Sequence, residues 1–211
     1  MQIHTFLFNP FQENTYLISD EYGKTAIIDP GCYDKSEERQ LEEYIEQNDL
    51  EPVLLLNTHT HLDHIFGNRF IEKRYGLSPK YHKLDQMVFD LADRTAEVYG
   101  LNLQKGSQAK EYLKEGESIE VGNLSLDILL VPGHSPGHIV FYSKEHKVII
   151  GGDVLFKGSI GRTDLPGGNH DDLIKSIKSQ IFTLDEEIVI YPGHGEPTTV
   201  GEEKQHNPFF K

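Results

Sequence analysis

Four side chains of the types that bind metal ions fall within six positions of the sequence. The segment THTHLDH supplies His59, His61, Asp63 and His64 and follows the apolar run PVLLLN at 52–57. In an extended chain, side chains two positions apart point the same way, so His59 and His61 can chelate one ion. Asp63 and His64 follow where the chain is expected to turn into a helix, and they can face a neighbouring point. One tetrahedral ion does not take four ligands from so short a stretch, so the segment predicts two adjacent ions.

Three further candidates complete the ligand set. Each follows a predicted strand and lies beside glycine: His134 in VPGHSPGH, Asp153 in IIGGD and His194 in IYPGHG. Glycine allows the backbone to turn sharply after a strand and to approach a ligand closely. A hydroxide bridging the two ions would be the nucleophile. In this hypothesis one ion takes His59, His61 and His134, the second takes Asp63, His64 and His194, and Asp153 is shared by both.

The elements that must position these residues come as two batches of strands, each followed by helices. Such an order favours two sheets packed face to face with helices outside. In the helix expected at 84–99, Met87, Leu91 and Val98 recur at helical spacing and are expected to face the core or to cover the site. Strands are predicted near 2–8, 14–19, 25–29, 52–57, 117–121, 124–131, 138–143, 147–151 and 186–193, and helices at 36–47, 64–75, 84–99 and 171–182, with a short tail.

Composition limits the classes of partner. The 211 residues contain 37% hydrophobic and 26% charged side chains, with no linker-like tract, so we expect one domain spanning 1–211. The net charge of −14 argues against nucleic acid as a partner. The first residues, MQIHTFLFNPFQENTYLI, show neither a basic n-region nor a long apolar h-region, so no signal peptide is expected. There is no apolar run of about 18 residues, so no membrane partner is expected, and a cytoplasmic location is the default. The single cysteine, Cys32, excludes an internal disulfide. The oligomeric state does not follow from the sequence.

The ordered motifs THTHLDH, PGHSPGH, GGDVLF and PGHG closely resemble those of the metallo-β-lactamase superfamily. The likeness begins with ENTYLI and IDPG and extends to QHNPF. It implies an α/β fold of the αββα four-layer sandwich type, with the metals at one edge between the sheets. It implies the same assignment of the seven ligands. It also implies that Asp29 and His138 orient ligating imidazoles.

Within the superfamily, GGDVLFKGSIGRTDLPGG resembles the corresponding loop of glyoxalase II and its short relatives. That likeness implies hydrolysis of a small-molecule acyl thioester such as S-lactoylglutathione. The cofactor would be two divalent metal ions, with zinc favoured over iron or manganese. Asp63 would orient the hydroxide or accept its proton while binding its ion, and the shared ligand Asp153 would complete the catalytic centre. Arg162 could bind a carboxylate or carbonyl oxygen of the substrate, or could pair with Asp164 or Asp171 to hold the loop.

Several alternatives stay open at this stage. The basic C-terminal extension with which glyoxalase II binds glutathione has no counterpart here, so the thiol is undetermined. A persulfide dioxygenase would bind one iron through His59, His134 and Asp153 on the same fold. A structural metal site without catalysis is the third alternative, although such a site is normally closed by four ligands. β-Lactam hydrolysis is not expected, because Asp153 stands where the commonest dizinc lactamases carry a cysteine ligand. A nuclease is disfavoured by the short, acidic chain.

Overall fold

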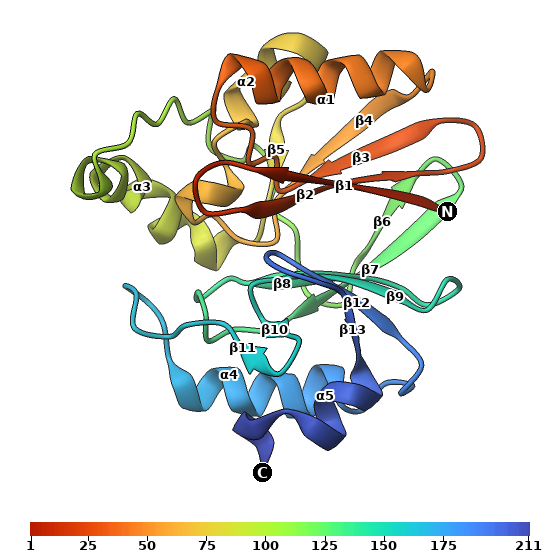
Figure 1. Cartoon of the computed structure of the whole chain (residues 1–211), viewed down its shortest axis with the longest axis vertical. Coiled ribbons are helices and arrows are strands. Elements are labelled where there is room, and N and C mark those ends of the chain that lie inside the picture. Colours follow the sequence, from red (N-terminus) through yellow and green to blue (C-terminus); the bar gives the residue numbers. More distant parts are fainter.

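The structure, a computed structural model, describes residues 1–211 as two β-sheets packed face to face between two layers of helices (Figure 1). From top to bottom in Figure 1, the layers are α1 (Lys35–Gln47) with α2 (Asn68–Tyr75), the first sheet, the second sheet, and α4 (His170–Ser176) with α5 (Val200–His206). This is the αββα sandwich expected from the sequence, and that prediction is confirmed.

The first sheet has the strand order β1-β2-β3-β4-β5. Its first three strands are antiparallel, whereas β3, β4 and β5 run parallel. Because β3 and β4 are parallel, their carboxyl ends meet at one edge, and the segment 57–64 begins there. The strands are β1 Gln2–Phe8, β2 Glu13–Ser19, β3 Lys24–Ile28, β4 Glu51–Leu56 and β5 Pro79–Lys80.

The second sheet has the order β13-β12-β9-β8-β7-β6. Strands β7 and β9 each pair antiparallel with β8, and β12 pairs parallel with β9, so β7, β9 and β12 all run the same way. His134, Asp153 and His194 follow these three strands and therefore meet at one edge. The strands are β6 Ser118–Val121, β7 Leu124–Leu130, β8 Ile139–Ser143, β9 Val148–Gly152, β12 Val189–Pro192 and β13 Thr198–Thr199, and β10 Leu155–Phe156 with β11 Ser159–Ile160 forms a separate hairpin.

Strands buried on both faces hold the sandwich together. In β2, Tyr16 and Ile18 point into the core between the sheets, while Leu17 points to the opposite side, against α1 and α2. All seven residues of β2 are buried. A third apolar cluster packs the outer face of the second sheet against α4 and α5. The strand ends that carry the ligands are thus anchored in cores on both sides of each sheet.

The boundaries of some expected helices differ from the structure. Only a 3₁₀ turn forms at Leu62–His64, and α2 begins later, at Asn68. The reason is local: the side-chain amide of Asn57 donates to the carbonyl of His64 at 2.9 Å, which bends the chain around the site. At the other end, α4 continues as a π-helical turn at Ile177–Ile181, and the expected tail forms β13 and α5.

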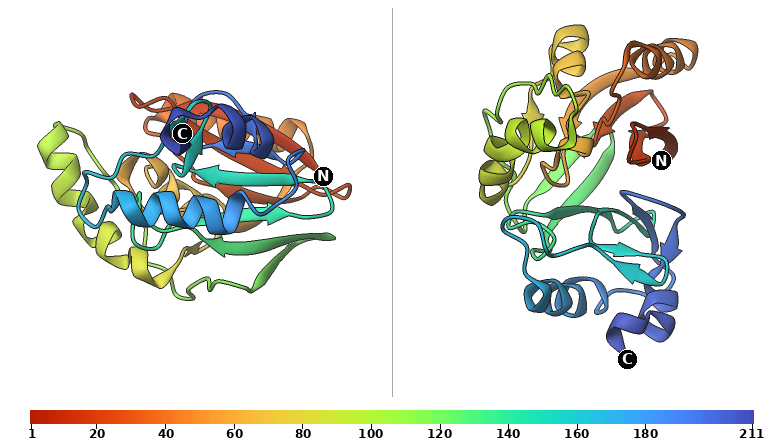
Figure 2. Two further views of the ribbon diagram at one scale, coloured as in Figure 1. Left: turned by 90° about the horizontal axis from the view of Figure 1, so that it is seen from below. Right: turned by 60° about the vertical axis from the view of Figure 1, so that its left-hand side comes forward.

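Helix α3 (Gln86–Tyr99) lies beside the two sheets and not on an outer face (Figure 2). Of the three residues expected to face the core or to cover the site, Met87 and Val98 do not face the core, because these side chains are 45% and 79% exposed. Leu91 is half-buried and lines a recess together with His61. The buried face of the helix consists instead of Val88, Phe89, Ala92 and Ala96. Phe89 and Ala92 belong to a small apolar cluster with Ile65 and Tyr81. No helix of the chain combines the length and apolar character needed to cross a membrane.

Candidate metal centre

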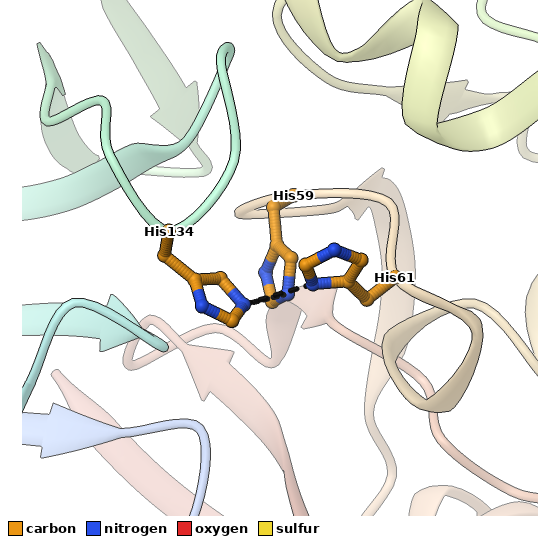
Figure 3. Close-up of side chains that lie close together, drawn as sticks. All are labelled: His59, His61 and His134. Atoms are coloured by element: carbon orange, nitrogen blue, oxygen red, sulfur yellow. Dashed lines mark hydrogen bonds between the residues drawn. The ribbon is translucent and has the colours of Figure 1, made fainter. Parts of the chain in front are cut away.

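Three histidines converge where the two sheets meet. His59 and His61 follow β4, and His134 comes from the loop after β7 (Figure 3). Nε2 of His134 lies 3.3 Å from Nε2 of His59 and 2.8 Å from Nδ1 of His61. These three nitrogens point at one another and lie within 4.8 Å of each other, so a single ion between them could be bound by all three.

A second group of ligands lies next to the first. Nε2 of His194 is 3.3 Å from Oδ2 of Asp63, and Nε2 of His64 is 3.7 Å from the same oxygen. Asp153 faces both groups: its carboxylate oxygens lie 3.6 Å from Nε2 of His134, 3.5 Å from that of His64 and 3.5 Å from that of His194. The structure therefore brings together all seven residues that the sequence proposed, with Asp153 between the two groups.

In four of the five ligand histidines, all but His61, the ring nitrogen that faces away from the centre is engaged by a neighbouring group. Nδ1 of His134 donates to the carbonyl of Arg162 at 2.8 Å, and Nδ1 of His194 lies 3.1 Å from the carbonyl of Phe11. Nδ1 of His59 lies 3.1 Å from the hydroxyl of Thr58. A donor hydrogen on Nδ1 leaves the lone pair on Nε2 facing the centre, which is the arrangement that orients metal-binding imidazoles.

The two residues expected to orient ligands lie against them. A carboxylate oxygen of Asp29 is 3.1 Å from Nδ1 of His64, and the same carboxylate accepts from the amide and the hydroxyl of Thr58. His138 stacks on His59, with ring centroids 4.7 Å apart. Nε2 of His138 also accepts from the backbone amide of Asp153 at 3.0 Å. This histidine therefore positions His59 by ring packing and Asp153 by a hydrogen bond to the backbone of Asp153.

The charges of the two groups differ. Burial, reinforced by neighbouring imidazoles, lowers the pKa of His59 far below its usual value and that of His61 to about 3, so both are neutral. Burial also acts against protonation of His194, but Asp153 and Asp63 raise its pKa to about 10. The same carboxylates hold the pKa of His64 well above its usual range against the effect of burial. The second ligand group, which lies beside the carboxylates of Asp63 and Asp153, thus favours positive charge.

The donor set fits metal ions. Nε2 of His64 and Oδ1 of Asp153 are buried, face each other at 3.5 Å and have no hydrogen-bond partner. Buried polar atoms without partners are rare in folded proteins, and a cation between them would satisfy both. Neutral imidazoles and carboxylates are the ligand forms that divalent metals require, so a metal ion would take the place of the protons that His64 and His194 otherwise hold. The cluster is compatible with two ions, one for each group.

Five of the seven ligands, all but the fully buried His59 and His64, line a cavity of about 550 Å³, which has the size of a small-molecule site. Arg162 lines this cavity, and its guanidinium pairs with both carboxylate oxygens of Asp164 at 2.8 Å. Of the two roles considered for Arg162, the structure shows the pairing that holds the loop. The remaining walls are largely apolar and include Phe11, Leu62, Tyr99, Phe156, Ile160 and Leu165.

Two acids of the site were not found from the sequence. Asp85 is buried and accepts hydrogen bonds from Thr60 on one ligand loop and from Ser135 and Gly137 on the other. Its partners lie 25 to 52 residues away, so no local pattern marks it. Glu13 is buried beneath His64, with one oxygen 3.9 Å from Nδ1 of that ring. Glu13 is the first residue of the motif ENTYLI, which forms the fully buried strand β2. An acid within such an apolar strand is the sequence feature that could have identified it.

Comparison with known proteins defines the class. Residues 8–194 match the family described as the metallo-beta-lactamase superfamily, and the chain belongs to that superfamily. The fold and the His/Asp cluster thus define a metallo-hydrolase. Among curated proteins, the hydroxyacylglutathione hydrolase GloC of Haemophilus influenzae is 39% identical over 212 residues, with 100% of this chain and 98% of that protein covered.

Two solved structures are similar over the full chain. The BLEG-1 B3 metallo-beta-lactamase has a TM-score of 0.92 and 31% identity, with 100% of both chains covered. TTHA1623 in a di-iron-bound form has a TM-score of 0.87 and 36% identity, covering 99% of this chain and 100% of that one. The di-iron form shows that a relative with this fold holds two metal ions.

Proposed function

We propose that this protein hydrolyses acyl thioesters of the S-lactoylglutathione type, using two divalent metal ions, with zinc the favoured metal. The observation that carries the proposal is the meeting of two ligand groups at Asp153, on the floor of a cavity large enough for a small molecule. The similarity to the hydrolase GloC over the entire chain supports the thioester as substrate. A closed structural site would not adjoin such a cavity.

The residues of the chain have separate tasks in this reaction. His59, His61 and His134 would hold one ion, and Asp63, His64 and His194 the other. When bound, the ions lower the pKa of water to about 7 and polarise the carbonyl group of the substrate. Asp153 would keep the two ions at a fixed separation.

Asp63 is the candidate proton acceptor. Burial acts to raise its pKa, but His64 and His194 lower it below the usual value, so the carboxylate is ionised at neutral pH. An ionised carboxylate facing the cavity can orient a water molecule and take its proton at a carboxylate oxygen. The apolar walls would exclude bulk water, which strengthens these interactions.

A panel of substrates tests the proposal. Metal-loaded protein should hydrolyse S-lactoylglutathione and simple S-acyl thioesters faster than a β-lactam, a lactone or a phosphodiester. The β-lactam belongs in the panel because a structural relative is named a B3 metallo-beta-lactamase. Asp63→Asn should lower kcat by about 10²–10⁴-fold, whereas Asp90→Asn, an exposed change on α3, should leave it unchanged. A higher kcat/KM for the β-lactam than for every thioester would overturn the proposal.

A second candidate uses part of the same centre. His59, His134 and Asp153 lie together, with Nε2 of His134 3.3 Å from Nε2 of His59 and 3.6 Å from the carboxylate of Asp153. These three side chains could hold one iron for persulfide oxidation. Consumption of oxygen with a persulfide substrate, in protein containing one iron per chain, would favour this candidate over the hydrolase.

A further inference from the structure

A small recess adjoins the main cavity beside the metal centre. It has a volume of about 30 Å³ and lies between α3 and the segment Leu165–Pro166. The recess and the main cavity share four lining residues, among them His61, whose ring contacts His134 at the centre. A group bound at the metal ions could therefore extend a short substituent into the recess. Its lining residues are Thr60, His61, Leu62, Val88, Leu91, Ala92, Thr95, Leu165 and Pro166.

The polar atoms of this lining are already bonded. The hydroxyl of Thr60 donates to Asp85, at 2.9 Å to the carbonyl. The hydroxyl of Thr95 donates to the carbonyl of Leu91 at 3.1 Å. No charged side chain lines the recess, and the rest of the wall is aliphatic or His61. A charged group placed there would lose its water without gaining a partner of opposite charge, so the recess selects against charged substituents.

The size of the recess decides which half of a thioester it takes. A water-sized group needs about 10–15 Å³ by this measure, so the recess accepts a chain of about two carbon atoms. That is far too small for a peptide thiol. On this basis, and resting on the proposed function, we infer that the recess binds the alkyl chain of a short acyl group, so that C4 acyl thioesters are preferred over acetyl thioesters.

The inference predicts a dependence on chain length that can be measured without turnover. Acetate, butyrate and hexanoate carry the same carboxylate, so their binding to metal-loaded protein by titration calorimetry isolates the alkyl chain. Each buried methylene is worth about a fourfold gain in affinity, so butyrate should bind about 15-fold more tightly than acetate. Hexanoate should gain nothing over butyrate, because the recess is already filled.

Two variants should move this preference in opposite directions. Ala92→Leu fills the recess and should remove the advantage of butyrate while leaving acetate unchanged. Leu91→Ala enlarges the recess and should make hexanoate the tightest of the three. Val98→Ala, on the exposed side of the same helix, is the matched control and should change no ratio. The comparison uses ratios of affinities between ligands, so a general loss of folded protein does not produce the same effect. If Ala92→Leu fails to fold, Ala92→Val takes its place.

Hydrolysis of the matching S-acyl thioesters separates this inference from the proposed function. Tight, recess-dependent binding of butyrate without hydrolysis of any thioester would leave the recess in place and overturn the hydrolase. Hydrolysis at equal kcat/KM for acetyl and butyryl thioesters, or equal affinity for acetate and butyrate, would overturn the assignment of the recess. A uniform loss for all chain lengths in Ala92→Leu would overturn it as well.

Discussion

Asp85 joins the two loops that carry the three-histidine group, and its removal should be among the most damaging single changes near the site. One carboxylate oxygen accepts from the amide of Thr60 at 2.6 Å, and the other accepts from the hydroxyl of Ser135 at 2.5 Å and the amide of Gly137 at 3.0 Å. Asp85 is fully buried and has no cationic partner. Burial raises its pKa, while these hydrogen bonds act to lower it.

The magnitude follows from the donors that would lose their acceptor. Asp85→Ala leaves the amides of Thr60 and Gly137 and the hydroxyl of Ser135 unpaired. Each buried unpaired donor costs about 1–3 kcal/mol. The alanine variant no longer has to bury a carboxylate, and this gain offsets part of the cost. We expect a loss of about 3–5 kcal/mol in the free energy of unfolding.

Asp85→Asn should lie between the wild type and Asp85→Ala. An amide offers one acceptor oxygen, so its NH₂ group must face either the amide of Thr60 or that of Gly137. The hydroxyls nearby can rotate to accept, but a backbone amide cannot, so one donor meets another. The expected loss is about 1–3 kcal/mol.

Urea unfolding followed by circular dichroism measures these differences, with Asp90→Ala as the control. Asp90 is exposed on α3, which begins directly after Asp85, and it bonds only to Gln86 among side chains, so its removal should change stability by less than about 0.5 kcal/mol. If Asp85 contributed only to stability, its replacement would not change the affinity of the ligands for metal. Metal affinity, measured by competition with a chelator, is therefore the second readout. Asp85→Asn should bind metal about 10–100-fold more weakly, because the two ligand loops lose their common acceptor. Stability of Asp85→Ala within about 0.5 kcal/mol of the wild type would refute the reasoning.

Three further outcomes are expected. Asp164→Asn should free the guanidinium of Arg162 and lower KM about two- to tenfold for a thioester that carries a carboxylate, but not for an uncharged one, in steady-state assays; an equal change for both would contradict this. The thiol of Cys32, buried and with a raised pKa, should resist an aromatic disulfide reagent in folded protein and react fully in urea; rapid reaction of the native protein would be the contrary result. Removal of metal by a chelator should lower Tm by several degrees in calorimetry, because ions at about 100 times their Kd stabilise the folded state by about 2.7 kcal/mol; an unchanged Tm would argue against resident metal.

The ligands could be predicted from the sequence because each lies in a short local pattern. His59, His61, Asp63 and His64 share one segment, and the other three follow strands that periodicity identifies. The common direction of β7, β9 and β12 then brings those strand ends to one edge. Local sequence was therefore enough to nominate the residues, and the topology of the sheets places them together.

The remaining features depend on contacts between distant segments. Asp85 acts on Thr60 and Ser135 across 25 and 50 residues, and nothing adjacent to it indicates this. Met87 and Val98 were also wrongly considered for the core, because they satisfy helical spacing as well as Ala92 does. Which face is buried depends on what the helix packs against, and small alanines on that face carry little hydrophobic signal.

The metal content of protein purified without a metal-binding tag tests the central claim most directly. Elemental analysis should give close to two metal ions per chain, mainly zinc or a mixture with iron or manganese. Asp63→Ala should reduce this to about one, because only the second group loses a ligand. One iron per chain in the wild type, unchanged in Asp63→Ala and accompanied by oxygen uptake with a persulfide, would contradict a two-metal hydrolase.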